Sequence, residues 1–307
     1  MPLDPQAQIV IDGITAIGLD VFNDDTDPTV IRALMTAVII PSTVEVATVE
    51  NREIPGPAGA LPVRIYRPAG DAPKPIVVFF HGGGWVVGSL DTHDHVARKL
   101  ANEIDAVVVS VDYRMGPEDR FPAAVEDSFA ALEWAHAEAA TIGGDPERLV
   151  VAGDSAGGNL AAIVAQMART SGPAVCFQLL VYPVTDYEFT SRSMEDNAEG
   201  FYLTRDMMRW FFDRYLNGPD EADDPRVSPL RNADLAGLPP AFVLTMEYDP
   251  LRDQGVAYGD AMRNAGNHVE NITYPGLFHG CFGMDEMIDA AKVPFADAVA
   301  AVRSAVE

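Results

Sequence analysis

Ser155 stands at the centre of the pentapeptide Gly-Asp-Ser-Ala-Gly at 153–157. The apolar run before it predicts a strand, and residues 159–168 after it predict a helix. Because almost no loop separates the two, the backbone at the corner is crowded, which explains Gly153 and Gly157. The corner exposes the Ser155 hydroxyl at a helix N-terminus, where free N–H groups stabilise negative charge. The pattern G-x-S-x-G is typical of a nucleophilic serine, although alone it also fits a tight turn with a capping serine.

A glycine-rich sequence, His-Gly-Gly-Gly-Trp-Val-Val-Gly-Ser at 81–89, follows another predicted strand. We call it the glycine loop. Glycines let backbone N–H groups point at a ligand with no side chains in the way, which suits the oxyanion formed when a carbonyl is attacked. A plain glycine-rich turn is the alternative. A phosphate-binding loop is disfavoured because neither Walker-A nor G-x-G-x-x-G spacing follows.

A serine hydroxyl is a weak nucleophile that needs a base, and the base needs an orienting carboxylate. His279 lies beside a glycine after the last predicted strand, and Asp249 follows the predicted strand at 241–246. Alone, His279 would be interpreted as an inert loop histidine and Asp249 as an Asp-Pro turn initiator. The order Ser155, Asp249, His279 is nevertheless the serine, acid, histidine order of α/β hydrolases.

The elements that must position these residues alternate along the chain from residue 76. Apolar strand-like runs alternate with helical patterns such as residues 121–140, which predicts a mostly parallel sheet covered by helices on both faces. The predicted strands lie at 76–80, 106–111, 149–153, 176–182, 241–246 and 269–274. The expected fold class is α/β, with functional groups at the carboxyl ends of the strands.

Two regions break this alternation, and we expect both to contribute to a helical cap. The N-terminal segment (residues 1–45) has two predicted apolar helical stripes, and the second follows an N-cap at Asp27 with Pro28 at the first helical position. The insertion (residues 186–235) is amphipathic and rich in aromatic residues, and a long insertion in an α/β domain is usually a lid; a structural helical excursion is the alternative. The remaining ranges, 46–185 and 236–307, would form the core. The first stripe comprises Val10, Ile14, Ile17 and Val21, and the second comprises Val30, Leu34 and Val38.

Composition limits the classes of partner. The net charge of −25 argues against nucleic acid and anionic membranes as partners. The negative charge is explained either by a need for solubility or by adaptation to salt. No apolar run is long enough to span a bilayer and the N-terminus is acidic, so we expect a cytoplasmic protein. Two cysteines imply no disulfide framework, and no metal-ligand spacing is present.

Four motifs together resemble the hormone-sensitive-lipase-like family of bacterial carboxylesterases: HGGGW, GDSAGGN, YDPLRDQG and FHG. The resemblance covers roughly residues 60–300 and implies an α/β-hydrolase fold with a helical cap. It implies that Ser155 is the nucleophile, His279 the base and Asp249 its orienting carboxylate. The implied oxyanion hole consists of the backbone N–H groups of Gly83, Gly84 and Ala156.

The resemblance further implies a serine carboxylesterase that hydrolyses short- to medium-chain acyl esters through an acyl-enzyme, with no metal or organic cofactor. A small-molecule ester is the expected partner, and a homodimer is left open. The alternatives are a non-catalytic small-molecule receptor, disfavoured by the presence of His279, and an amidase or acyltransferase with the same triad. The residues expected to bind substrate are Phe201, Leu203, Phe211 and Phe212.

Two positions depart from the family pattern. Gln254 stands where a glutamate is common, and Cys281 stands where an aromatic residue is common. The change at Gln254 should be mild. Cys281 lies two residues from His279, so it could alter the pocket or make activity sensitive to thiol reagents.

Overall fold

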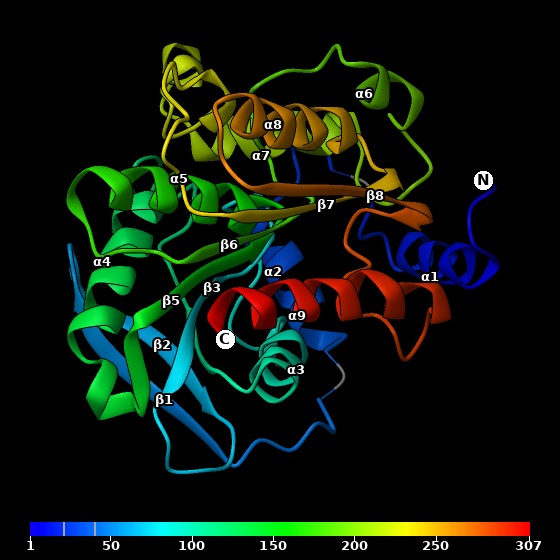
Figure 1. The fold of residues 1–307 in the computed structure, drawn as a ribbon. Helices are drawn as coiled ribbons and strands as arrows, with labels where there is room; N and C mark the ends of the chain where they lie inside the picture. The colour runs from blue at the N-terminus through cyan, green and yellow to red at the C-terminus, as the bar shows by residue number, and fades with distance from the viewer. Residues whose placement is uncertain (21, 40) are drawn as a thin grey trace.

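The computed structural model describes residues 1–20, 22–39 and 41–307, and its centre is a twisted eight-stranded sheet (Figure 1). The strand order is β1-β2-β4-β3-β5-β6-β7-β8. The strands are β1 (Thr48–Gly56), β2 (Gly59–Arg67), β3 (Lys74–Phe80), β4 (Val107–Val111), β5 (Gly144–Asp154), β6 (Phe177–Val181), β7 (Ala241–Tyr248) and β8 (Val269–Phe278).

All six strands expected from the apolar runs are present, and they pair in parallel from β4 through β3, β5, β6 and β7 to β8. Strands β1 and β2 were not predicted; they pair antiparallel with one another, and β2 pairs antiparallel with β4. Exposed residues alternate with half-buried or buried ones along much of both strands, so neither has the continuous apolar run of a fully buried strand. The predicted α/β fold class, a mostly parallel sheet flanked by helices, is confirmed.

Helices cover both faces of the sheet, as Figure 1 shows. On one face, α3 (Asp94–Ile104) packs against α9 (Lys292–Val306), which also contacts β6 and β7. On the other face, α4 (Ala123–Ala137) packs against α5 (Ala156–Ser171), and α8 (Arg252–Asn264) contacts β7 and β8. The helix predicted within residues 121–140 is α4. The short 3₁₀ turns are η1 (Ala139–Ile142), η2 (Pro219–Asp223), η3 (Pro229–Arg231) and η4 (Asp289–Ala291).

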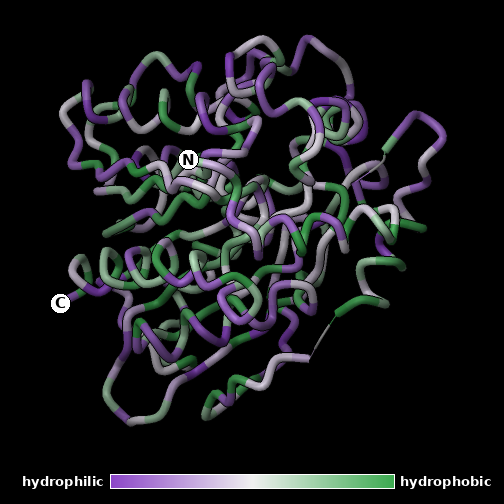
Figure 2. Tube along the Cα trace, turned by 90° about the vertical axis from the view of Figure 1, so that its right-hand side faces the viewer, coloured by the Kyte–Doolittle hydropathy of each residue, from purple (hydrophilic) through white to green (hydrophobic). Residues whose placement is uncertain are grey.

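The core consists of two apolar clusters, one on each face of the sheet. Figure 2 shows hydrophobic stretches running through the middle of the molecule and more hydrophilic stretches along the outer turns. Strands β4 and β6 are buried along their whole length, which explains why their sequences are nearly continuous apolar runs. Among the described residues, no helix is both long enough and apolar enough to cross a bilayer.

The N-terminal segment and the insertion lie against one another. The N-terminal segment carries α1 (Pro5–Ala16) and α2 (Pro28–Ala37), and the insertion carries α6 (Arg192–Asp196) and α7 (Arg205–Tyr215). The ring of Phe22 packs on the rings of Trp210 and Phe211 at centroid distances of 4.8 and 5.5 Å. Arg214 of α7 donates to the carbonyls of Asp24 and Thr26.

The predicted helix start at Asp27 is confirmed, because its side chain accepts from the Thr29 N–H at 2.8 Å. The predicted apolar stripe of α2 is wrong: Val30, Leu34 and Val38 are 53%, 37% and 47% exposed, whereas Ile31 is buried. The apolar residues of α2 form two rows with helical i, i+4 spacing, one with Val30, Leu34 and Val38 and the other with Ile31 and Met35. The sequence pattern alone therefore does not decide which row faces the core.

In α1 the buried residues are Ala7 and Ile11, with Ile14 partly buried. Ile17 lies beyond the end of the helix and is 46% exposed, so the predicted stripe does not extend to it. Val21, the last residue of that stripe, lies outside the described residues.

Candidate active site

Four strands, β3 and β5 on one side of β6, and β7 and β8 on the other, bring the candidate residues to one edge of the sheet. The glycine loop begins directly after β3, and Ser155 directly after β5. Asp249 follows β7 and His279 follows β8 in the same way. These strands are parallel, so their carboxyl ends meet at one edge, which is where α/β proteins place their sites.

Ser155 occupies the crowded corner that the sequence predicts. Its φ of 56° and ψ of −118° lie in a region that non-glycine residues rarely adopt. A Cβ on Gly153 would lie 2.3 Å from the carbonyl oxygen of Gly157, and one on Gly157 would lie 1.9 Å from that of Phe80. Only glycine therefore fits on either side of the serine.

Ser155, His279 and Asp249 form one continuous line of hydrogen bonds. The Ser155 Oγ lies 2.9 Å from the His279 Nε2, and the His279 Nδ1 lies 2.8 Å from the Asp249 Oδ2. The three residues are 8%, 5% and 0% exposed, so little water competes for these bonds. An ionised carboxylate only accepts hydrogen bonds, so Nδ1 carries the imidazole proton and Nε2 is free to accept the serine proton.

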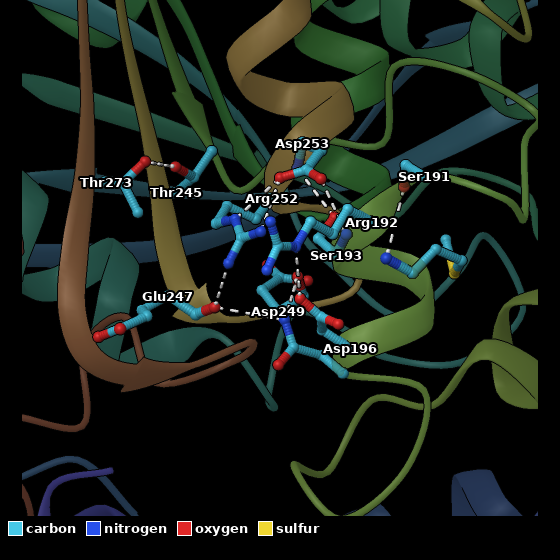
Figure 3. Close-up of polar contacts among 12 residues, drawn as sticks. Ser191, Arg192, Ser193, Asp196, Thr245, Glu247, Asp249, Arg252, Asp253 and Thr273 are labelled. Atoms are coloured by element: carbon cyan, nitrogen blue, oxygen red, sulfur yellow. Dashed lines mark hydrogen bonds and ion pairs between the residues drawn. The ribbon is translucent and has the colours of Figure 1, made fainter. Parts of the chain in front are cut away.

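Hydrogen bonds hold both the side chain and the backbone of Asp249. Its Oδ1 accepts from the Leu251 N–H at 2.7 Å, and its carbonyl accepts from the Asn197 side chain at 3.2 Å. Ser193 of α6 donates its hydroxyl to the Pro250 carbonyl. Figure 3 shows Asp249 beside Ser193 and the start of α8, where the Asp253 carboxylate accepts from the Ser193 N–H. The insertion therefore fixes the loop that carries the carboxylate.

Three backbone N–H groups are available near the serine. Gly83 and Gly84 have φ values of 119° and 58°, and Ala156 is the first residue of α5. Within the part of the chain that the structure describes, none of the three N–H groups has an intramolecular acceptor. A Cβ on Gly84 would lie 2.2 Å from the ring of Phe211, so the insertion packs directly on this loop.

Asp154 is a site residue whose role the sequence analysis missed. Its Oδ1 accepts from the Gly82 N–H at 2.9 Å and lies 3.3 Å from the His93 Nε2. Burial opposes the carboxylate charge, but the imidazoles of His93, His81 and His279 outweigh it and lower the pKa of Asp154. Asp154, the residue before Ser155, therefore joins the glycine loop to the end of β5. The available signal was its position inside the pentapeptide.

A cavity of about 1030 Å³ opens over Ser155 and His279. Of the residues expected to bind substrate, Leu203 and Phe211 line it, whereas Phe201 and Phe212 do not. Its apolar wall includes Ile14, Leu19, Phe22, Ile31 and Met35 from the N-terminal segment and Leu203, Met207 and Phe211 from the insertion.

Phe201 and Phe212 pack elsewhere in the insertion. The Phe201 ring lies against Tyr248 at a centroid distance of 4.7 Å. Phe212 packs on Trp85 at 5.2 Å and lines a separate cavity of about 560 Å³. Successive helical residues point roughly 100° apart, and in α7 Phe211 faces the cavity over Ser155 whereas Phe212 faces Trp85.

Gln254 and Cys281, the two positions that depart from the family pattern, both lie in the protein interior. The Oε1 of Gln254 accepts from the N–H groups of Thr185 and Asp186 at 2.7 and 3.0 Å, a task that a glutamate would share. Cys281 is fully buried, and burial raises the pKa of its thiol to about 12.

Residues 77–283 match the model of a family described by its alpha/beta hydrolase fold. The chain belongs to this family. This chain is 40% identical over 311 residues to the carboxylic ester hydrolase LipN of Mycobacterium tuberculosis, and the match covers 98% of this chain and 83% of LipN. It is 46% identical over 250 residues to the carboxylesterase NlhH of the same species, covering 80% and 78% of the two chains.

Solved structures agree with these relatives. A hyperthermophilic esterase from Pyrobaculum calidifontis superposes with a TM-score of 0.92 and 38% identity, covering all of both chains. The resemblance to the hormone-sensitive-lipase-like family is confirmed, as is the predicted enzyme class, carboxylic ester hydrolase.

Proposed function

We propose that this α/β hydrolase is a serine carboxylesterase that hydrolyses short- to medium-chain acyl esters. The observation that carries the proposal is the unbroken line of hydrogen bonds from the Ser155 Oγ through His279 to the Asp249 carboxylate. A hydroxyl, an imidazole and a carboxylate in this order form the arrangement that activates serine for acyl transfer.

In the first step, the Ser155 Oγ attacks the ester carbonyl as its proton passes to the His279 Nε2. Asp249 accepts from Nδ1 throughout, which stabilises the imidazolium that forms. The imidazolium then gives its proton to the departing alcohol oxygen, and the acyl group stays bonded to Oγ.

The negative charge of the tetrahedral intermediate lies on the former carbonyl oxygen. The free N–H groups of Gly83, Gly84 and Ala156 are the donors that would bind it. Loss of one such donor typically costs ~3 kcal/mol of transition-state stabilisation.

In the second step, water attacks the acyl-enzyme. His279 takes a proton from this water and returns a proton to Oγ as the carboxylic acid leaves. The same three N–H groups bind the second oxyanion, so a single site serves both halves of the reaction.

The N-terminal segment and the insertion would act as the cap of this enzyme. Both supply apolar side chains to the cavity over Ser155, and the apolar part of an ester gains by leaving water for such a wall. Within the insertion, Leu203 and Phe211 are the predicted substrate contacts that the cavity supports.

A panel of p-nitrophenyl esters of increasing acyl length, with a p-nitroanilide as control, tests the proposal. We expect hydrolysis of the esters, fastest for short and medium chains, and little hydrolysis of the anilide. In the folded variant Ser155→Ala, kcat should fall by roughly 10⁶. Equal rates for ester and anilide would favour an amidase, and near-full activity of Ser155→Ala would refute the nucleophile.

A further inference from the structure

Arg32 of α2 makes an unusual set of contacts for a residue of the N-terminal segment, since it reaches the glycine loop. Its Nε donates to the Val86 carbonyl at 2.8 Å, and its Nη2 donates to the Gly116 carbonyl at 2.7 Å. Both outer nitrogens also pair with the Glu118 carboxylate at 2.8 and 2.9 Å. This fork of donors to fixed carbonyls is a geometry that arginine provides and lysine does not.

The peptide unit that Arg32 holds is bonded on its other side to Gly83. The Val86 carbonyl and the Val87 N–H belong to one planar trans peptide, so they point in opposite directions. The carbonyl accepts from Arg32, and the Val87 N–H donates to the Gly83 carbonyl at 2.9 Å. Val86 and Val87 are both buried, so the peptide unit between them lies largely out of water.

The next peptide unit, between Gly83 and Gly84, is fixed in the same way. The Gly83 carbonyl and the Gly84 N–H also share one planar unit, so fixing the carbonyl turns the N–H the opposite way. The Val86 N–H adds a second bond to the same carbonyl at 3.1 Å. Two rigid peptide planes thus connect the Arg32 guanidinium to the Gly84 N–H.

Gly84 needs this support because its own backbone is permissive. Its φ is 58°, and glycine has no side chain that would restrict it. The Gly116 contact adds a second hold on the loop, because the Gly116 N–H donates to the Trp85 carbonyl at 2.9 Å. Arg32 is therefore connected to the glycine loop at two points, through the Val86 carbonyl and through Gly116, which bonds Trp85.

We propose that Arg32 is a positioning residue that orients the Gly84 N–H toward the oxyanion through these two peptide planes. This rests on the proposed function, in which that N–H binds the oxyanion. An oxyanion donor acts in the transition state, so its misalignment lowers kcat and leaves KM nearly unchanged.

The test compares Arg32→Met with Arg214→Met. Methionine keeps much of the apolar stem and removes the donors. Arg214 is a matched control, because its side chain also bonds the N-terminal segment, at Asp24 and Thr26, and makes no hydrogen bond to the glycine loop among the described residues. We expect Arg32→Met to lower kcat on p-nitrophenyl acetate by ~10–100-fold at unchanged KM, the range of a displaced catalytic group. Arg32→Lys should recover part of this loss. The kcat of Arg214→Met should stay within about twofold of the wild-type value, which is small beside the loss expected for Arg32→Met.

Backbone hydrogen exchange over residues 82–90 gives a readout that does not depend on activity. It should quicken in Arg32→Met and stay at the wild-type rate in Arg214→Met, because only the first variant frees the Val86–Val87 peptide. A wild-type kcat or wild-type exchange in Arg32→Met would overturn the proposal. Equal kcat losses in the two variants would also overturn it, since seating of the N-terminal segment would then explain both. If wild type hydrolyses no ester, the proposed function fails, and the exchange rates still decide whether Arg32 holds the loop.

Discussion

Ser155 is kept in a backbone conformation that costs a non-glycine residue about 1–3 kcal/mol. Its N–H donates to the Val181 carbonyl at 2.8 Å, and its own carbonyl accepts from Asn159 and Val184. These bonds tie the corner to α5 and to the end of β6. The strain is thus offset by neighbouring elements, and the hydroxyl stays aimed at His279.

Cys281, two residues from His279, should not make activity thiol-sensitive. Burial raises the pKa of its thiol to about 12, so the reactive thiolate is scarce at neutral pH, and the side chain has no exposed surface. We expect a disulfide reagent such as dithionitrobenzoate to leave esterase activity intact in the folded protein. In guanidinium both Cys176 and Cys281 should react, which is the control. Inactivation that follows the labelling of Cys281 in folded protein would contradict this prediction.

His81 should make stability depend on pH. Burial, aided by nearby His93, lowers the pKa of His81 to about 4, so the folded protein keeps it neutral where the unfolded chain would protonate it. Between pH 4 and 6.5 the unfolded state therefore binds more protons, and the free energy of unfolding rises with pH across this window. The contribution of His81 is up to about 3 kcal/mol.

The measurement is urea unfolding of wild type and His81→Asn at several pH values. His95, whose pKa burial also lowers to about 4, contributes equally to both proteins. The difference in free energy between the two proteins should therefore change with pH, with wild type losing more stability than the variant as the pH falls to 4. A difference that is constant from pH 4 to 7 would exclude this role of His81.

At the scale of elements, the continuous apolar runs predicted β3 to β7 because the predicted part of each strand is buried on both faces. The edge strand β8 has no such run, since exposed and half-buried residues stand among the buried ones over residues 269–274. The sharp strand-to-helix corner at Ser155 was predictable because glycine is required on both sides of it. The buried face of α2 was not, because the row of Val30 and Leu34 and the row of Ile31 and Met35 are equally apolar. Which row is buried depends on the cavity wall, a tertiary contact between residues distant in sequence.

The correct face of α2 leads to a prediction on acyl-chain length. Ile31 lines the cavity, whereas its neighbour Val30 is 53% exposed. In Ile31→Trp the larger side chain should fill part of the cavity. It should lower kcat/KM for p-nitrophenyl octanoate by roughly tenfold or more relative to p-nitrophenyl acetate, because even one methylene that no longer fits costs about 1–3 kcal/mol.

Val30→Trp is the matched control for Ile31→Trp, since it adds the same ring to the solvent side of the helix. Its chain-length profile on p-nitrophenyl esters should equal that of wild type. Matching profiles for Ile31→Trp and wild type would mean that the N-terminal segment does not bound the acyl pocket.

At the scale of the whole molecule, the chain has 46 acidic residues and only 21 lysines and arginines. Ion pairing therefore cannot neutralise the surface, and like charges repel in the folded state. Salt shortens the range of this repulsion from about 30 Å at 0.01 M to about 3 Å at 1 M. We expect Tm to rise with sodium chloride from 0.01 to 0.5 M, by more than in sucrose of equal osmolality. A falling Tm, or equal effects of salt and sucrose, would contradict this expectation.

The central claim, that Ser155 attacks the ester carbonyl, is tested most directly by trapping the nucleophile. A p-nitrophenyl phosphonate ester transfers its phosphonyl group to an activated serine: the Oγ–P bond forms as the bond from phosphorus to p-nitrophenolate breaks. The adduct resembles the tetrahedral intermediate. Intact-mass and peptide analysis should find one adduct per chain, on Ser155, with none in Ser155→Ala or in protein unfolded before exposure. An adduct on another residue, or undiminished ester hydrolysis by protein fully labelled at Ser155, would contradict the claim.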